Sequence, residues 1–414
     1  MQRTRWLLIL IAAMMSLHSE MLAVESVCTE SLVWSKDEDG LWPYHVPGIL
    51  VTRRGTVLVW ADARQDGGGD FAPHHMVLKR SVDQGRTWSA NQYIGRIEKQ
   101  EIYLFGNAVQ SRESDRIYFF YTQKHPDDIH RRTWIWLRHS DDDGVSWSEP
   151  REMVRILVEQ DRKRAEAIRQ GTAGLEFQGE DPERYAREQF YTGPGRIIQL
   201  PGDHPVAPGR IIIPVLAVKD RDSQERSDLP SLLRRGQGNT VLYSDDQGQT
   251  WIAGGAVPMN GLPLGEPSIV DLSDGRLLMN SRVEKHDYRV TSLSTDGGLS
   301  WSKPTRDTSG IPTYFETHAG LLRLPPDSPS GPSAPILFSF PNAPTRRNLT
   351  IMVSLDDHQS WLHRKVIHAG RSYYSNMDAH GGFIYLVFGR GGEHPWLPAE
   401  TVLLRFNYEW LTSP

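Results

Sequence analysis

Short apolar stretches alternate with turn-forming glycine, aspartate and serine along most of the chain. This arrangement predicts β-strands joined by tight turns. Near the N-terminal end, strands are predicted over 45–51, 56–63, 75–81 and 91–94. Further strands are predicted in pairs at 116–121 with 134–139, 210–216 with 239–243 and 276–282 with 288–293, and singly at 336–340 and 383–388.

Five copies of one short pattern, S-x-D-x-G-x-[ST]-W, sit where predicted strands end. They begin at Ser81, Ser140, Ser244, Ser294 and Ser354. The aspartate can accept hydrogen bonds from the local backbone, and the glycine tolerates a positive φ. The closing tryptophan offers a large apolar surface that holds the hairpin against its neighbour. Recurrence of the pattern predicts an array of similar β units.

The spacing of these copies predicts a ring of units. Six four-stranded units of about 65 residues each would account for the chain after residue 23. The gap between the second and third copies is the longest and fits two units with an insertion. A linear stack of sheets would expose an edge at each end, so a ring is favoured, closed by 401–410 together with 31–35. The predicted fold is therefore all-β, a six-bladed β-propeller over 24–414.

One segment departs from the strand pattern. Residues 151–187 contain a helix-type run with Glu159 and Lys163 at i,i+4. We interpret it as a helical insertion on the surface between the second and third units, with its charges on a solvated face. It is not predicted to form a domain of its own.

The first residues resemble a signal peptide. Arg3 and Arg5 precede an apolar run, 6–17, which is too short to span a bilayer. Residues 1–23 are predicted to be removed after Ala23, and the alternative is an uncleaved N-terminal anchor. No other stretch reaches membrane length, so the mature chain is predicted to be secreted or periplasmic without an integral membrane span.

Composition excludes some classes of binding partner and of covalent cross-link. Of the 414 residues, 13 are tryptophan and 14 tyrosine, which suits a β protein with aromatic turn packing. The net charge of −5 offers no basic surface for nucleic acid. Cys28 is the only cysteine, so an intrachain disulfide framework is impossible.

Three further stretches resemble the bacterial exo-sialidase superfamily. They are Tyr44-His-Val-Pro47 with Ala61-Asp-Ala-Arg64 and Gly69-Asp70, then Glu266-Pro-Ser with Arg282, and finally Arg371-Ser-Tyr-Tyr374-Ser375. Members of this superfamily have six-bladed propellers whose turn motifs are called Asp boxes. The resemblance runs from about Tyr44 to the C-terminus, apart from the helical insertion. It implies a retaining glycoside hydrolase that removes a terminal sugar from a glycan.

The resemblance implies catalytic roles for three residues. Tyr374 is the nucleophile, Glu266 its base, and Asp70 the acid/base on the other face of the substrate. A tyrosine suits a substrate with a carboxylate on its anomeric carbon, because a neutral phenol approaches where a carboxylate would be repelled. A free phenol has a pKa of about 10, so a neighbouring base must take its proton. The ordinary alternatives are core packing for the tyrosine, a turn for the aspartate and a loop cap for the glutamate.

The resemblance also implies a substrate-binding set: Arg282, Arg64, His45 and His318. Sialidases hold the sialic acid carboxylate with three arginines, since a guanidinium binds a carboxylate bidentately. Arg282 matches the second. His45 stands at the first position, and the third is predicted at Met352, which cannot donate a hydrogen bond. Arg346, Arg347 and Arg390 are candidates to replace it, and the substrate is predicted to be a different acidic or crowded terminal sugar.

Other signals are weaker. His74, His75, His318 and His380 could line a sugar pocket or bind a metal, but no HExxH or Cys/His spacing supports a metal. No cofactor is expected. Two functions remain open: a sialidase-type hydrolase, and a glycan-binding propeller that has lost catalysis.

Overall fold

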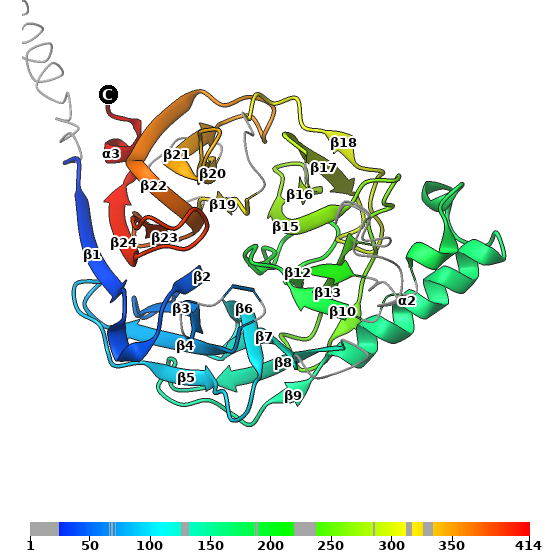
Figure 1. Cartoon of the computed structure of the whole chain (residues 1–414). Helices are drawn as coiled ribbons and strands as arrows, with labels where there is room; N and C mark the ends of the chain where they lie inside the picture. The colour runs from blue at the N-terminus through cyan, green and yellow to red at the C-terminus, as the bar shows by residue number, and fades with distance from the viewer. Residues whose placement is uncertain are drawn as a thin grey trace, which may run out of the picture.

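Antiparallel sheets are set around a common centre in the computed structural model of the chain (Figure 1). It describes residues 25–414 except 66, 68, 71, 126–131, 186, 188, 219–236, 285, 312–316 and 326–333. The predicted signal peptide, residues 1–23, lies outside the described residues. In the described part of the chain, no helix is long and apolar enough to cross a membrane.

Consecutive strands form groups of antiparallel neighbours. In the first half, the groups are β2 (Tyr44–Val51), β3 (Val57–Arg64), β4 (His74–Ser81) and β5 (Gln92–Gly95), followed by β6 (Ile102–Gln110), β7 (Ile117–Lys124), β8 (Thr133–Ser140) and β9 (Arg151–Glu152). Next, β10 (Gln189–Thr192) and β11 (Ile198–Gln199) both pair with β12 (Ile211–Val218), which continues to β13 (Gly238–Ser244) and β14 (Ile252–Ala253). The strands β15 (Leu264–Asp271), β16 (Leu277–Val283), β17 (Arg289–Ser294) and β18 (Thr305–Arg306) make the next sheet. Every predicted strand in this half overlaps an observed one.

The two ends of the chain meet in the last sheet. After β19 (Gly320–Arg323), β20 (Ile336–Pro341) and β21 (Arg347–Ser354), the long strand β22 (His363–His380) pairs first with β21 and then with β23 (Phe383–Arg390). The strand β24 (Glu400–Asn407) lies between β23 and β1 (Cys28–Ser35). The predicted pairing of the terminal segments is thus present, although the strand ends at Asn407 and the helix α3 (Tyr408–Thr412) follows.

The repeated turns share one hydrogen-bonding arrangement. In the first copy, the Ser81 hydroxyl donates to Asp83 at 2.7 Å and accepts from the Gly85 amide at 2.8 Å. Asp83 in turn accepts from the Thr87 amide at 2.9 Å. The fifth copy breaks the template, because His358 occupies the glycine position with a φ of 71°. Its amide still donates to the Ser354 hydroxyl, so the turn keeps its form without the glycine.

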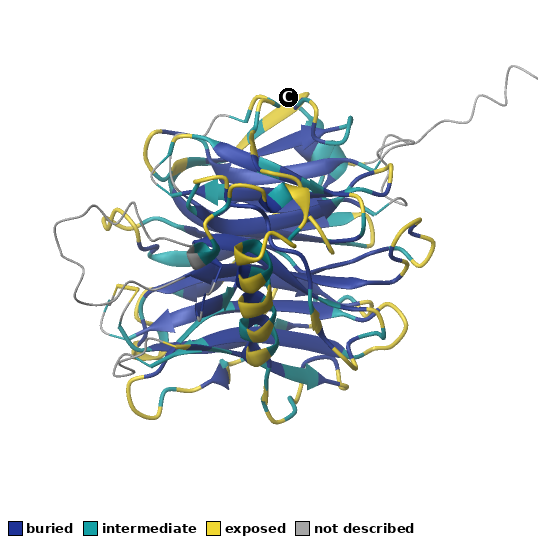
Figure 2. Cartoon of the chain, turned by 90° about the vertical axis from the view of Figure 1, so that its right-hand side faces the viewer, coloured by how far each residue is buried: buried dark blue, intermediate teal, exposed yellow. Residues whose placement is uncertain are grey.

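The predicted helical insertion is present as α2 (Val154–Arg169), followed by the short helices η2 (Leu175–Phe177) and η3 (Pro182–Arg184). It lies outside the ring (Figure 1), and its outward face is exposed (Figure 2). Lys163 and Glu159 form the expected pair at 3.3 Å. The prediction of a wholly solvated charge run is wrong for Asp161, which is 1% exposed and accepts bonds from Arg187 and Arg164.

Side-chain amides tie the innermost strands together. Asn107 donates to the carbonyl of Gly193 at 3.1 Å, and Asn239 donates to that of Gly265 at 2.6 Å. Asn376 reaches two carbonyls, those of Pro47 and Pro194, at 2.9 and 3.1 Å. Buried carbonyls need such partners, because no neighbouring strand supplies them at the centre. These bonds hold inner strands from distant parts of the sequence at fixed positions.

Candidate active site

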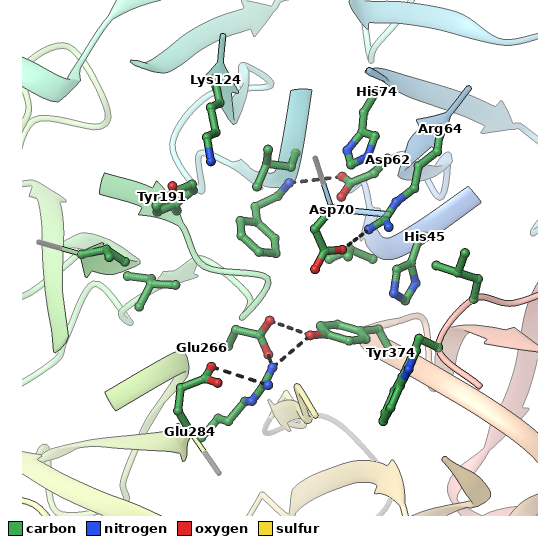
Figure 3. A pocket seen from close by; sticks show the side chains of 18 of the residues that line it. His45, Asp62, Arg64, Asp70, His74, Lys124, Tyr191, Glu266, Glu284 and Tyr374 are labelled. Atoms are coloured by element: carbon green, nitrogen blue, oxygen red, sulfur yellow. Dashed lines mark hydrogen bonds and ion pairs between the residues drawn. The ribbon is translucent and has the colours of Figure 1, made fainter. Parts of the chain in front are cut away.

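A pocket of about 490 Å³ opens at the centre of the ring (Figure 3). Its walls come from strands far apart in the sequence, including β2, β6, β10, β15 and β22. Most of the polar side chains that line it can ionise: His45, Asp62, Arg64, Asp70, His74, Lys124, Glu266, Arg282, Glu284 and Arg346. A concave site with converging titratable groups is the usual form of an active site.

Irregularities in the inner strands direct side chains into this pocket. The pairing register shifts between His45 and Gly48, between Leu104 and Asn107, and between Leu264 and Pro267. A fourth shift lies between Ser372 and Ser375. A β-bulge bends a strand and re-aims its side chains. Each irregular stretch carries or adjoins a pocket residue. In a regular strand, successive side chains point to opposite faces, so some of these groups would point away from the pocket. The bulges turn them toward it.

Tyr374, Glu266 and Arg282 form one hydrogen-bonded cluster on the pocket floor. The Tyr374 hydroxyl donates to Glu266 Oε1 at 2.6 Å. Arg282 Nη1 donates to Glu266 Oε2 at 3.1 Å and to the Tyr374 hydroxyl at 3.3 Å. Arg282 Nη2 lies 3.5 Å from Glu284 Oε1. Tyr374 and Glu266 are each 6% exposed, so the phenol–carboxylate contact is shielded from water.

The cluster shifts the pKa of each member. Burial and the adjacent Glu266 carboxylate raise the pKa of Tyr374. Burial also opposes the charged form of Glu266, but Arg282, His318 and the Tyr374 hydroxyl together lower its pKa. Glu266 is therefore ionised and Tyr374 neutral near neutral pH. The carboxylate is poised to accept the phenol proton, and the guanidinium is placed to stabilise the resulting phenolate.

Asp70 lies at the mouth of the same pocket. Its side chain is 84% exposed and its Oδ1 lies 3.0 Å from Arg64 Nη2, whose own side chain is 4% exposed. Figure 3 shows Asp70 projecting from the wall that carries Arg64, on the opposite side of the space from Glu266. Asp62 lies behind it, and burial raises its pKa well above the usual range. Asp62 is thus the shielded carboxyl group of this wall, and Asp70 is the one that faces solvent.

His45 and Arg346 complete the wall near Tyr374. The His45 ring lies edge-on to the Tyr374 ring at 5.1 Å and is 4% exposed. Burial, Arg64 and Arg346 lower the pKa of His45 well below 6.5, so it is neutral. The Arg346 guanidinium lies 5.3 Å from the centre of the Tyr374 ring. Arg282 and Arg346 thus place two fixed positive charges beside Tyr374.

The chain is similar to known proteins over most of its length. The sequence profile of the BNR repeat-like domain matches residues 55–386, which is most of the chain. This protein belongs to the BNR repeat-like family.

Curated relatives of this BNR repeat-like protein are named sialidase. That of Micromonospora viridifaciens is 29% identical over 86% of this chain and 51% of its own length. That of Clostridium perfringens is 24% identical over 66% of this chain and 64% of its own length. The chain therefore spans about half to two thirds of the length of these relatives.

Solved structures share the fold. The Hadza microbial sialidase Hz136 superposes with a TM-score of 0.70 at 18% identity, covering 92% of this chain and 69% of its own. The intramolecular trans-sialidase from Ruminococcus gnavus, in complex with oseltamivir carboxylate, gives 0.67 at 17% identity, covering 90% of this chain and 96% of its own.

Most of the predicted site residues converge. Tyr374, Glu266, Arg282, Asp70, Arg64 and His45 all line the one pocket. His318 does not line it, contrary to expectation. It is fully buried behind Tyr374, stacked on that ring at 5.8 Å, with Nε2 3.4 Å from Asn376 Oδ1.

The predicted position of the third arginine is also wrong. Met352 is fully buried in an apolar cluster with Phe338 and Trp361. Of the three candidates to replace it, Arg346 lines the pocket. Arg390 is bound to Glu30 and Glu400 instead, while Arg347 is exposed at the start of β21.

Among the carboxylates that line the pocket, Glu284 and Asp62 were not predicted. Each lies two residues from a predicted arginine, Arg282 and Arg64 respectively. Residues two apart on a strand share a face, so this spacing was a usable signal. Among the described residues, no group of three or more His, Cys, Asp or Glu could hold a metal ion.

Proposed function

We propose that this protein is an exported, retaining exo-glycosidase of sialidase type that removes a terminal acidic sugar from a glycan. The observation that carries the proposal is the 2.6 Å hydrogen bond from the Tyr374 hydroxyl to Glu266 on the floor of a pocket that Asp70 overhangs. A nucleophile within hydrogen-bond reach of its base, with a separate acid at the mouth, is the arrangement that nucleophilic glycoside cleavage needs.

The fold proposal is a six-bladed β-propeller with Asp-box turns over residues 24–414, the segment 151–187 being its helical insertion. The four-stranded groups would be the blades, and β22 would serve two of them, because it pairs with β21 and then with β23. The pairing of β1 with β24 would close the last blade. Residues 1–23 are proposed to be a signal peptide that directs the chain to the periplasm or the medium.

The reaction would proceed in two balanced steps. In the first, Glu266 takes the phenol proton, the Tyr374 oxygen bonds to the anomeric carbon, and the glycosidic C–O bond breaks as Asp70 gives its proton to the leaving oxygen. In the second, Asp70 takes a proton from water, the water oxygen bonds to the anomeric carbon, the Tyr374–carbon bond breaks, and Glu266 returns its proton to the Tyr374 oxygen. Arg282 stabilises the negative charge on the tyrosine oxygen in both, since it contacts that oxygen at 3.3 Å.

The charges in the pocket favour a glycone with one carboxylate. Arg346 and Arg282 flank Tyr374, so a carboxylate on the anomeric carbon would lie between two guanidiniums. His45 adds a neutral imidazole where the resemblance implies a third cation. The carboxylate is thus held by less charge than in a three-arginine site, and this supports an acidic sugar without selecting sialic acid itself.

The test is a panel of aryl glycosides, a sialoside among them, with the wild type, Tyr374→Phe and Asp70→Ala. Release of aryl alcohol by the wild type, abolished in both variants, supports the hydrolase. Tyr385→Phe is the matched control, because Tyr385 is a buried tyrosine on β23 that is absent from the pocket lining in the described chain. It should release the aryl alcohol at the wild-type rate.

The second candidate function is a glycan-binding propeller without catalysis. The neutral His45 favours this candidate, because an uncharged imidazole binds a substrate carboxylate more weakly than a cation does. Weaker binding of that carboxylate is consistent with a protein that has lost catalysis. Binding of the same glycosides with no release by the wild type would support this candidate and overturn the hydrolase.

A further inference from the structure

A buried histidine lies close to Asp70 and has no part in the proposed reaction. His74 is the first residue of β4, is 1% exposed and lines the pocket beside Arg64 (Figure 3). Burial and Arg64 lower its pKa to about 3, so the ring is neutral near neutral pH and carries a single N–H. Nε2 lies 3.2 Å from the Gly69 carbonyl oxygen, which can only accept, and this places the N–H on Nε2.

Asp70 projects from the loop that joins β3 to β4. Packing does little to hold its side chain, which is 84% exposed. The carbonyl of Gly69, the residue directly before it, accepts from His74 Nε2 and from the Ala72 amide at 3.0 Å. The Ala72 amide belongs to the loop itself, so His74 is the donor that ties Gly69 to the sheet.

His74 and Arg64 hold the acid/base from one pair of strands. They are directly opposite each other in the pairing of β4 with β3. Arg64 contacts the Asp70 carboxylate at 3.0 Å, while His74 contacts the backbone just before it. His74 is itself held in place, because its amide donates to the Glu101 carbonyl at 3.2 Å and its ring is enclosed. Its Nδ1 has no hydrogen-bond partner among the described residues, so the bond to Gly69 is what orients the ring.

We propose that His74 is a positioning residue for the acid/base: its Nε2–H holds the Gly69 carbonyl and thereby sets where the Asp70 carboxyl group meets the leaving oxygen. The inference rests on the proposed function for the role of Asp70. A general acid works only within hydrogen-bond reach of the oxygen that it protonates, and a displacement of about 1 Å can cost about 10²-fold in rate. Loss of the His74 donor should therefore impair protonation of the leaving group and spare the attack by Tyr374.

Two aryl glycosides of similar shape separate protonation of the leaving group from substrate binding. They are the 4-nitrophenyl and 4-methylphenyl α-glycosides of N-acetylneuraminic acid. The weakly basic 4-nitrophenolate leaves with little help from an acid, whereas the more basic 4-methylphenolate needs a proton. In His74→Phe, which keeps a buried ring but removes the donor, kcat/KM for the 4-methylphenyl glycoside should fall about 100-fold. The 4-nitrophenyl value should fall less than about fivefold.

His74→Gln should restore most of the 4-methylphenyl value, because its amide again offers an N–H donor. Equal losses on both glycosides in His74→Phe would overturn the proposal, since they would mean that His74 only shapes the pocket. Unchanged values for both would overturn it as well. His75→Phe is the matched control, because His75 is buried on the other face of β4 and is not among the described pocket residues. This variant should hydrolyse both glycosides at the wild-type rate.

A spectroscopic measurement keeps the test independent of turnover and of the folding of His74→Phe. Nitrogen NMR of the wild type, labelled with nitrogen-15 histidine, should show His74 as the Nε2–H tautomer, with the signal assigned by its loss in His74→Gln. The signal should not titrate near pH 6.5, where an ordinary histidine gains its second proton. An Nδ1–H tautomer, or titration near that pH, would overturn the bond to Gly69. If the wild type hydrolyses neither glycoside, the hydrolase proposal fails, and the tautomer still decides whether His74 holds the loop.

Discussion

Two regions of this protein bury a carboxylate against guanidinium groups. One of these carboxylates is enclosed within the fold, and the other borders the pocket. In the helical insertion, Asp161 accepts from the Arg187 backbone and guanidinium at 2.7 to 3.0 Å and from Arg164 at 2.8 Å. On the pocket floor, Glu266 accepts from Arg282 and from the Tyr374 hydroxyl.

The difference lies in what each carboxylate faces. Asp161 is 1% exposed, and every described partner of it is a guanidinium or an amide that keeps its proton. Glu266 lines a cavity, and one partner is a phenol whose proton can move to it. A buried ion pair by itself is therefore weak evidence of function, whereas a pair with a transferable proton beside a cavity indicates chemistry. Changes at these two sites should separate stability from turnover.

The largest effect is expected for Glu266→Gln. An amide cannot accept the Tyr374 proton, so kcat for an aryl sialoside should fall about 10³-fold. The free energy of unfolding should change less than in Asp161→Asn, described next. Arg282 keeps Glu284 as a partner, and water in the pocket can reach the Arg282 guanidinium. Steady-state kinetics with a denaturation curve would check both. Retention of wild-type turnover would remove Glu266 from the mechanism.

Asp161→Asn should destabilise the fold and leave kcat/KM of the folded protein unchanged. Arg187 is fully buried and would lose its anionic partner, so the free energy of unfolding should fall by about 3–5 kcal/mol. Glu159→Gln on the same helix is the control, because its pair with Lys163 is solvent-exposed and should be worth less than about 1 kcal/mol. A fall in kcat/KM of the folded Asp161→Asn protein would contradict the proposed division of roles.

His318 should make stability depend on pH through the pocket region. Burial lowers its pKa to about 4 from 6.5. The unfolded chain therefore binds a proton at a higher pH than the folded chain, and stability is lost as pH falls from 6.5 to about 4. The full loss from this group is on the order of 3 kcal/mol. Urea denaturation across this window should show a shallower decline for His318→Gln, and an identical decline would exclude His318 as a contributor.

The smallest effect is expected for His45→Arg. A third positive charge near Tyr374 should strengthen the hold on a carboxylate, lowering KM for an acidic glycoside by about fivefold. KM for a neutral aryl glycoside should stay the same. His139→Arg, on the half-exposed outer strand β8, adds the same charge away from the pocket and should leave both values unchanged. A uniform change for both substrates would mean that residue 45 affects the nucleophile and not the carboxylate.

Strand positions were predictable from the sequence because apolar stretches and turn residues are local signals. Each predicted strand overlaps an observed one, and the pattern ending at Trp88 has the expected hydrogen bonds. Convergence of Tyr374, Glu266 and Asp70 could be predicted only from the family resemblance. The bulges that aim these side chains inward have no sequence pattern of their own.

Errors arose where a residue's environment depends on distant partners. Met352 was placed in the site by its distance from Ser354, but its side chain faces the apolar core. Arg346, which lies just before β21, faces the pocket instead. Asp161 looked solvated within a charged run because its partner Arg187 comes from the far end of the insertion. His318 was assigned to the wall, whereas it supports Tyr374 from behind.

The pairing of β1 with β24 limits how many N-terminal residues can be removed without disrupting the last sheet. A leader cut after Ala23 falls ahead of Cys28, where β1 begins, so the seam with β24 would survive maturation intact. Removing the 8 residues of β1 would take away the strand that pairs with β24. The backbone of β24 would then be free to pair with another chain. If the proposed leader is removed after Ala23, the few residues before Cys28 keep that cut away from the edge whose exposure would permit pairing with another chain.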